Sequence, residues 1–285
     1  MSRVMRAYYY TILGAIGGIV SWQVSNWIGL SFSANIYVSD AVAGALIGFC
    51  LGFPLGAADG FLSRSAVRGA RSGLRYGLVG MVTGLIGLPL GEIAFHVLGQ
   101  GVFGRAVGWG LFGLLLGMAE GVAGRSELWK GALGGSLGGM LGGTLLETAL
   151  PLLGDLTYGK AFGLALLGAA IGAVIAFVVV MLSRSWLEVT EGKLKGTTFI
   201  LDKFMPSGSP SAMIGSSPLK SEIVLMDPDV EPQHAMLMGS GTHFTLKDIS
   251  MGGTYLGRRK VQQATLSDGA VIRLGDSALV YHERR

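Results

Sequence analysis

The side chains able to support acid–base or metal chemistry are few and scattered in this sequence. It has one cysteine and four histidines: Cys50, His96, His234, His243 and His282. A metal site needs several such ligands at short, regular spacings, which these residues do not have. Glycine-rich stretches are frequent, but none is followed by the Lys-Ser/Thr pair of a phosphate-binding loop. We therefore expect no enzyme, no metal site and no cofactor.

Four carboxylates lie in or beside long apolar stretches, where a charge is costly. They are Asp59, Glu92, Glu120 and Glu147. Asp59 and Glu120 each precede an arginine, Arg64 or Arg125, so we expect ion pairs near a helix end. Glu92 and Glu147 have no basic neighbour in sequence, and we expect a structural polar pair. They would be protonated, hydrogen-bonded across helices or turned toward a cavity. Passage of protons or cations is the alternative.

Three short turns in the polar last third carry the residues best suited to bind a peptide. They are Gly215-Ser216-Ser217, Glu231-Pro232-Gln233-His234 and Gly252-Gly253-Thr254. Short β-type runs separate them, as in a small all-β sandwich. Their order resembles that of forkhead-associated (FHA) domains, a family that reads phosphothreonine peptides. The resemblance covers about residues 186–285.

The resemblance implies a role for each turn. In the family, the first turn supplies an arginine and the second a serine to the phosphate, and an asparagine in the third holds the peptide backbone. This sequence has Ser216, Glu231 and Gly252 at those positions. Because a carboxylate repels a phosphate, we predict binding independent of phosphothreonine, with Lys220, Arg258 or Arg259 as the alternative phosphate contacts. By resemblance, the peptide-binding positions are Ser216, Ser217, Glu231, Gln233, Gly252, Gly253 and Thr254, and His234 is structural.

The alternating pattern predicts further strands around these turns. They cover residues 186–190 and 197–201 before the first turn, and 256–261, 264–266, 271–274 and 278–282 after the third. No Gly/Ser-rich or Pro-rich linker precedes the first of these strands.

The preceding part of the chain has a different composition. The whole sequence is 50% hydrophobic and 14% charged, whereas soluble domains carry about 25% charged residues. Residues 1–185 hold 37 of the 48 glycines, and we predict domains at 1–185 and 186–285. The second domain has 11 basic and 11 acidic residues, so the net charge of +4 belongs to the first. Without a basic face on the soluble domain, we expect no nucleic-acid partner.

Six apolar runs of about 20 residues are predicted to span a bilayer. They cover roughly residues 9–30, 41–62, 76–98, 106–124, 131–153 and 161–182. With a cytosolic N-terminus, nine of the eleven basic residues in this part lie on the cytosolic side, and only Arg105 and Lys160 lie outside. The positive-inside rule therefore predicts a multi-pass protein of the plasma membrane, or the inner membrane of a bacterium, with both termini cytosolic.

Glycines at four-residue spacing indicate how these helices pack. The stripes are Gly48-52-56-60, Gly113-117-121, Gly131-135-139-143 with Gly134-138-142, and Gly168-172. Such stripes let helix backbones approach closely in lipid. We expect a tightly packed glycine-zipper scaffold, with a sliding transporter bundle as the alternative.

The predicted fold class is an all-α membrane bundle of about six transmembrane helices, followed by an all-β FHA-like sandwich. The predicted function is a signalling scaffold or adaptor in a membrane complex, with the lipid bilayer and cytosolic or membrane proteins as partners. Homo-oligomerisation is compatible with this prediction. The alternative is a proton or cation transporter or channel subunit that is regulated through the C-terminal domain.

Overall fold

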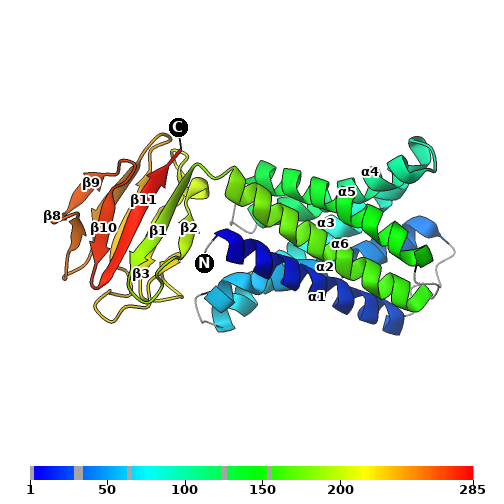
Figure 1. Ribbon diagram of the computed structural model, residues 1–285, viewed down its shortest axis with the longest axis horizontal. Coiled ribbons are helices and arrows are strands. Elements are labelled where there is room, and N and C mark those ends of the chain that lie inside the picture. The colour runs from blue at the N-terminus through cyan, green and yellow to red at the C-terminus, as the bar shows by residue number, and fades with distance from the viewer. Residues whose placement is uncertain (1–2, 29–34, 63–65, 123–126, 153–155, 285) are drawn as a thin grey trace. The chain divides into compact units, whose positions relative to one another are not determined.

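The computed structural model describes residues 3–28, 35–62, 66–122, 127–152 and 156–284. The chain divides into two compact units, one helical and ending at Met181, the other built of β-strands from Leu182 onward. Figure 1 shows the two kinds of structure along the chain.

The helical unit contains six helices among the described residues. They are α1 (Arg3–Ile28), α2 (Ile36–Leu62), α3 (Ala66–Val97), α4 (Val102–Val122), α5 (Leu128–Leu152) and α6 (Leu156–Met181). Each overlaps one of the predicted apolar runs, and the last residues of the runs at 9–30, 106–124 and 131–153 lie outside the described residues. Four of the six, α2, α3, α4 and α6, have the length and apolar composition needed to cross a membrane.

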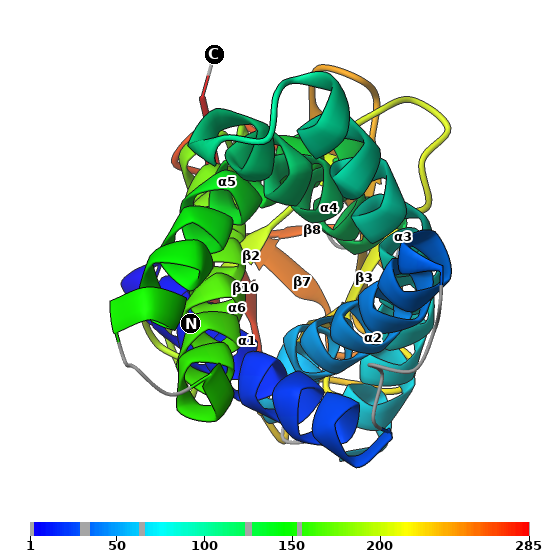
Figure 2. The same ribbon diagram turned by 90° about the vertical axis from the view of Figure 1, so that its right-hand side faces the viewer.

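The six helices form a ring in chain order (Figure 2). Consecutive helices from α2 to α6 pack against each other, and α1 closes the ring against α6. The closing contacts join Tyr10 to Gly172, Gly14 to Gly168 and Gly18 to Leu164. In these pairs one residue number rises by four as the other falls by four, which identifies α1 and α6 as antiparallel neighbours.

Glycine lines the faces along which neighbouring helices meet. The buried residues of α3 are seven glycines and Tyr76. A methyl group on Gly48 of α2 would collide with the carbonyl of Gly80 on α3, and one on Gly113 of α4 with the carbonyl of Gly135 on α5. The four-residue stripes therefore bring backbones into direct contact, as the spacing predicts.

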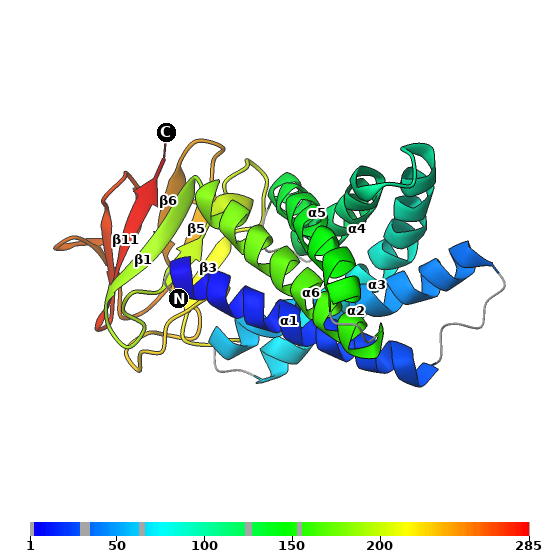
Figure 3. The same ribbon diagram turned by 45° about the vertical axis from the view of Figure 1, so that its right-hand side comes forward.

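The β unit is a sandwich of two sheets. Its strands are β1 (Ser185–Glu191), β2 (Thr198–Ile200), β3 (Ala212–Gly215), β4 (Ile223–Val224), β5 (Ala235–Gly239), β6 (Phe244–Asp248), β7 (Thr254–Leu256), β8 (Arg259–Val261), β9 (Gln263–Thr265), β10 (Val271–Leu274) and β11 (Ser277–Glu283). One sheet has the order β2-β1-β11-β10-β7-β8 and the other β4-β3-β5-β6-β9. In Figure 3 the layer of β1 and β11 lies beside the layer of β3, β5 and β6.

Alternating apolar residues on the inner faces fill the space between the sheets. Leu187 and Val189 of β1 and Leu279 and Tyr281 of β11 are fully buried in a core shared with the second sheet. The single strand predicted over 256–261 is wrong, because Gly257 has a φ of +63° and the chain turns there. Leu256 is the last residue of β7 and residues 259–261 form β8, and the two strands pair as an antiparallel hairpin.

Candidate functional site

Three loops of the β unit carry the residues that the sequence singles out for peptide binding. The first loop (216–222) joins β3 to β4, the second (225–234) joins β4 to β5, and the third (249–253) joins β6 to β7. Main-chain hydrogen bonds connect all three. The amide of Ser216 donates to the carbonyl of Glu231 at 2.9 Å, and the amide of Ile249 donates to the carbonyl of His234 at 3.1 Å. The chain therefore brings the three predicted turns together into one site.

Glu231 lies between the second and third loops. Its half-buried carboxylate accepts hydrogen bonds through Oε1 from the amides of Met251, at 2.6 Å, and Gly252, at 3.3 Å. Charge-assisted bonds of this kind are among the strongest that backbone amides make. The chain thus places an anion of its own on the third loop, from the position that the resemblance assigns to a phosphate-binding serine.

His234 connects the same two loops from the inside of the unit. The side chain is buried, and Nδ1 accepts a hydrogen bond from the amide of Glu231 at 3.1 Å. An imidazole whose Nδ1 accepts carries its proton on Nε2, and that atom lies 3.3 Å from the carbonyl of Gly253. His234 therefore holds the backbone of both loops and has no ring nitrogen left for a ligand.

Asp248 organises the third loop from its N-terminal end. The carboxylate accepts hydrogen bonds from the hydroxyls of Ser250, at 2.7 Å, and Thr254, at 2.9 Å, and from both of their amides. Burial alone would raise the pKa of Asp248, but these hydrogen bonds hold the pKa below its ordinary value. The sequence prediction missed Asp248 and Ser250, although an Asp two residues before a Ser is a common turn-forming pattern.

The remaining predicted residues divide into exposed and enclosed ones. Thr254 is fully buried and donates its hydroxyl to Asp248, so its side chain faces inward rather than toward a ligand. Gly253 is buried with a φ of +90°, a conformation that favours glycine. Ser216 and Ser217 are half-buried, whereas Gln233 and Gly252 are exposed. Gln233 donates through Nε2 to the carbonyl of Lys220 at 3.4 Å.

Two lysines flank the three loops. Lys220 is exposed on the first loop, and Lys260 of β8 is exposed with Nζ 3.5 Å from the carbonyl of Gly252. Arg258 and Arg259 are also exposed, at the turn of the β7–β8 hairpin.

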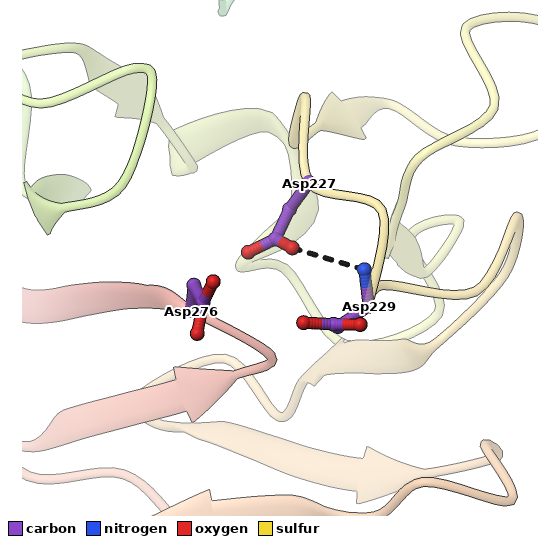
Figure 4. Close-up of side chains that lie close together, drawn as sticks. All are labelled: Asp227, Asp229 and Asp276. Carbon is purple, nitrogen blue, oxygen red and sulfur yellow. Dashed lines mark hydrogen bonds between the residues drawn. The ribbon is translucent and has the colours of Figure 1, made fainter.

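An acidic cluster stands apart from these contacts. Asp227, Asp229 and Asp276 bring carboxylate oxygens within 4.8 Å of one another (Figure 4). Asp227 accepts a hydrogen bond from the Ser277 hydroxyl at 2.7 Å and one from the Asp229 amide at 3.0 Å. Both of its oxygens thus already support the local turns, and we assign no ligand to the cluster.

The helical unit has a charged cluster of its own. Arg105 of α4 approaches Glu92 of α3 at 3.1 Å and Glu147 of α5 at 3.4 Å. Trp109 donates through Nε1 to Glu147 at 3.4 Å. The two carboxylates therefore share one guanidinium, a partner that the sequence prediction assigned to an outer loop. Asp59 and Glu120 lie on α2 and α4, but their side chains, like Arg64 and Arg125, lie outside the described residues.

Comparison with known proteins agrees with the geometry of the loops. The family model of the FHA domain matches residues 212–275, which contain all three loops. The β unit contains an FHA domain. FHA domains are protein–protein interaction modules, so the match implies an interaction module in this part of the chain. No family model matches the helical unit.

Several known proteins are similar to the FHA domain of this chain. The glycogen accumulation regulator GarA of Mycolicibacterium smegmatis is 33% identical over 96 residues, which are 33% of this chain and 56% of that protein. GarA of Mycobacterium tuberculosis is 32% identical over 96 residues, again 33% of this chain, and 55% of that protein. The chain thus matches about half the length of these curated relatives.

Solved structures of FHA domains are also similar. The FHA domain of the Chlamydia trachomatis protein CT664 is 29% identical, with 36% of this chain and 100% of that chain covered and a TM-score of 0.32. A structure from a study of phosphothreonine-dependent FHA domain interactions is 28% identical, with 36% and 98% covered and a TM-score of 0.31.

Proposed function

We propose that this protein is a membrane-anchored scaffold whose FHA domain binds a protein partner without requiring phosphothreonine. The observation that carries the proposal is the carboxylate of Glu231 on the amides of the third loop. A phosphate brought to the same amides would meet a negative charge already bonded to them. The first loop has Ser216 in place of the phosphate-binding arginine of the family, so no guanidinium offsets that repulsion there.

Membrane anchoring is supported by the helical unit's distribution of side chains. Helix α3 buries glycine and exposes large apolar residues, among them Leu78, Val82, Ile86 and Leu90. Such a helix is unfavourable in water, because burial of apolar surface drives folding there. In lipid the same arrangement is favourable, since small residues let helices pack and large ones face the acyl chains.

The predicted orientation completes the proposal. Basic residues concentrated on one side of the helical part favour cytosolic N- and C-termini, which would place the FHA domain among cytosolic partners. GarA proteins are regulators by name, and a regulatory assembly at the plasma membrane is the role we propose for this chain. The domain division at about residue 185 belongs to the same proposal.

Paired peptide binding tests the independence from phosphorylation. The full chain in lipid nanodiscs would be presented to an array of threonine peptides, each in an unphosphorylated and a phosphorylated form. We expect binding of the two forms to differ by less than about twofold, which corresponds to roughly 0.4 kcal/mol. A consistent gain of tenfold or more for phosphorylated peptides would overturn the proposal.

Side-specific labelling tests the anchoring. Lys193→Cys in a Cys50→Ser background places a thiol at an exposed position of the FHA domain. In right-side-out membrane vesicles, an impermeant maleimide should label it only after the membrane is opened. Labelling before opening would place the domain outside. Recovery of the protein in the fraction without membranes would refute membrane anchoring.

The charged cluster favours a structural role over transport, the second function considered. Arg105 lies within ion-pair distance of Glu92 and Glu147, so two carboxylates that a transport path would need free are paired. Proton or cation flux in proteoliposomes that disappears in the Glu92→Gln and Glu147→Gln variants would instead establish transport.

A further inference from the structure

From Ser185 onward, the exposed large apolar side chains of the β unit lie on or beside the three loops. Between Ser185 and Arg284, all of them described, four large apolar residues are exposed: Leu219 on the first loop, Ile249 and Met251 on the third, and Tyr255 on the adjoining strand β7. We call these four residues the apolar rim. Met251 is 96% exposed and Leu219 is 68% exposed. Clustered exposed apolar side chains on a water-soluble domain mark interaction surfaces.

The loops that carry the rim are held in place from within. The carboxylate of Glu231 and the hydroxyl of Ser250 bind three successive amides of the third loop, those of Met251, Gly252 and Gly253. The first loop is attached to the second by the Ser221 hydroxyl, which donates to the carbonyl of Pro232 at 2.7 Å. A rim fixed before binding loses less conformational entropy when a partner arrives.

Two exposed lysines adjoin the rim. Lys220 is adjacent to Leu219 in sequence, and Lys260 pairs with Tyr255 across the β7–β8 hairpin. Both lysines are exposed. The carboxylates of Glu231 and Asp248 are bonded to amides of the third loop, and that of the exposed Glu222 accepts a hydrogen bond from the amide of Met213 at 2.8 Å. The two exposed ammonium groups can therefore complement carboxylates of a partner.

We propose that the apolar rim binds an unphosphorylated protein segment that presents an apolar side chain flanked by Asp or Glu. The inference rests on the proposed function, because it assumes that the three loops bind protein without a phosphate. The apolar side chain would pack on Met251 and Leu219, and the flanking carboxylates would lie near Lys220 and Lys260. Glu231 acts as a positioning residue, since its carboxylate holds the third loop through the amides of Met251 and Gly252.

Peptides of defined composition test this partner chemistry. The full chain in nanodiscs would be offered four immobilised peptide sets: leucine with glutamate flanks, leucine with lysine flanks, serine with glutamate flanks, and phosphothreonine with serine flanks. We expect enrichment of the first set over all others. Equal retention of the first three sets, or retention of none, would overturn the inference. Preference for the fourth set would instead overturn the proposed function.

Variants locate the binding surface. Met251→Ser should weaken binding of the leucine–glutamate peptides by at least about fivefold, as expected for a central apolar contact. Lys220→Ala with Lys260→Ala should reduce the preference for glutamate over lysine flanks. The matched control is Lys193→Ala with Lys195→Ala, two exposed lysines of the β1–β2 turn outside the three loops. Loss of binding in the control, or none in Met251→Ser, would contradict the location.

A lipid surface is the other class of partner that an apolar, basic rim could meet, and the same protein can report it. A dye on Met251→Cys, in a Cys50→Ser background, should be insensitive to doxyl-labelled lipid in the nanodisc and should shift to shorter wavelength when leucine–glutamate peptide is added. Strong quenching by the labelled lipid without peptide would show that the rim faces the bilayer and would overturn the inference.

Discussion

The two units of this protein differ in which residues make their closest contacts and which are exposed. In the helical unit the closest contacts between helices are made by glycine, and helix α3 buries seven glycines while it exposes leucine, isoleucine and valine. In the β unit the core is mainly leucine, isoleucine, valine and phenylalanine, and between Ser185 and Arg284 the exposed large apolar residues are those of the rim. The difference teaches that apolar burial alone fills the core of the β unit, whereas the helical unit also depends on close backbone contact at glycine. Substitutions should therefore have opposite consequences in the two units.

The largest effect is expected where two helix backbones touch. Gly135→Leu would force a side chain into the carbonyl of Gly113, and overpacking against backbone should cost at least ~3 kcal/mol. Fluorescence-detected size exclusion during heating in mild detergent would measure the loss of folded protein. Leu141→Ala, on the exposed face of the same helix, is the matched control and should change stability by less than about 0.5 kcal/mol. Tolerance of Gly135→Leu would contradict the α4–α5 contact.

The β unit should show the reverse sensitivity. Phe244→Ala removes a fully buried ring from the sandwich core, and such truncations cost about 3–5 kcal/mol. Hydrogen exchange of amides in β5 and β6, followed by mass spectrometry on the full chain, would report the loss locally. Leu219→Ala, which trims an exposed rim residue, should leave exchange unchanged. Equal effects of the two substitutions would remove the contrast between core and rim.

The charged cluster tests whether polar contacts also stabilise the helical unit. Arg105→Met leaves Glu92 and Glu147 without their shared guanidinium. Because Arg105 is 36% exposed, we expect a cost of about 1–3 kcal/mol, below that of breaking a fully buried pair. Thermal unfolding in detergent would measure it. In a Glu92→Gln, Glu147→Gln background the same substitution should cost much less, and an unchanged cost would refute the ion pairs.

The smallest effect concerns the third loop and its dependence on pH. The pKa of Asp248 is lowered in the folded chain, so its carboxylate stabilises the β unit above the ordinary value of 3.8. That contribution is lost as pH falls through the folded-state pKa. Asp248→Asn should cost about 1 kcal/mol at pH 7, and the difference from wild type should shrink near pH 3. Exchange rates of the third-loop amides at both pH values would measure the difference between wild type and variant. A difference that grows at low pH would contradict the predicted loss of the carboxylate's contribution.

The spacing of residues along the sequence predicted the broad architecture, because it reflects the geometry of a single helix or strand and its turns. Glycine every four residues indicated the faces that meet between helices, and the ordered turns around Glu231 and His234 indicated the FHA domain. The Leu256–Val261 strand was predicted wrongly because a hairpin centred on Gly257 has the same apolar pattern as a single strand.

Partners distant in sequence were beyond such reasoning. Arg105 follows Glu92 by 13 residues and precedes Glu147 by 42, so only the packing of α3, α4 and α5 shows that one guanidinium serves both. The role of Asp248 was missed for a related reason, since turn propensity predicts a bend without saying from which amides the carboxylate accepts hydrogen bonds. The inward orientation of Thr254 likewise depends on that carboxylate.

The contact of Gly14 with Gly168 has a consequence for biosynthesis. The ribosome makes α1 first and α6 last among the helices, so the seam between them stays open until the helical part is almost complete. In a chain interrupted before α6, the face of α1 that carries Gly14 and Gly18 has no α6 to pack against. Because the FHA domain is translated after α6, it emerges only once every helix needed to close the seam has been made.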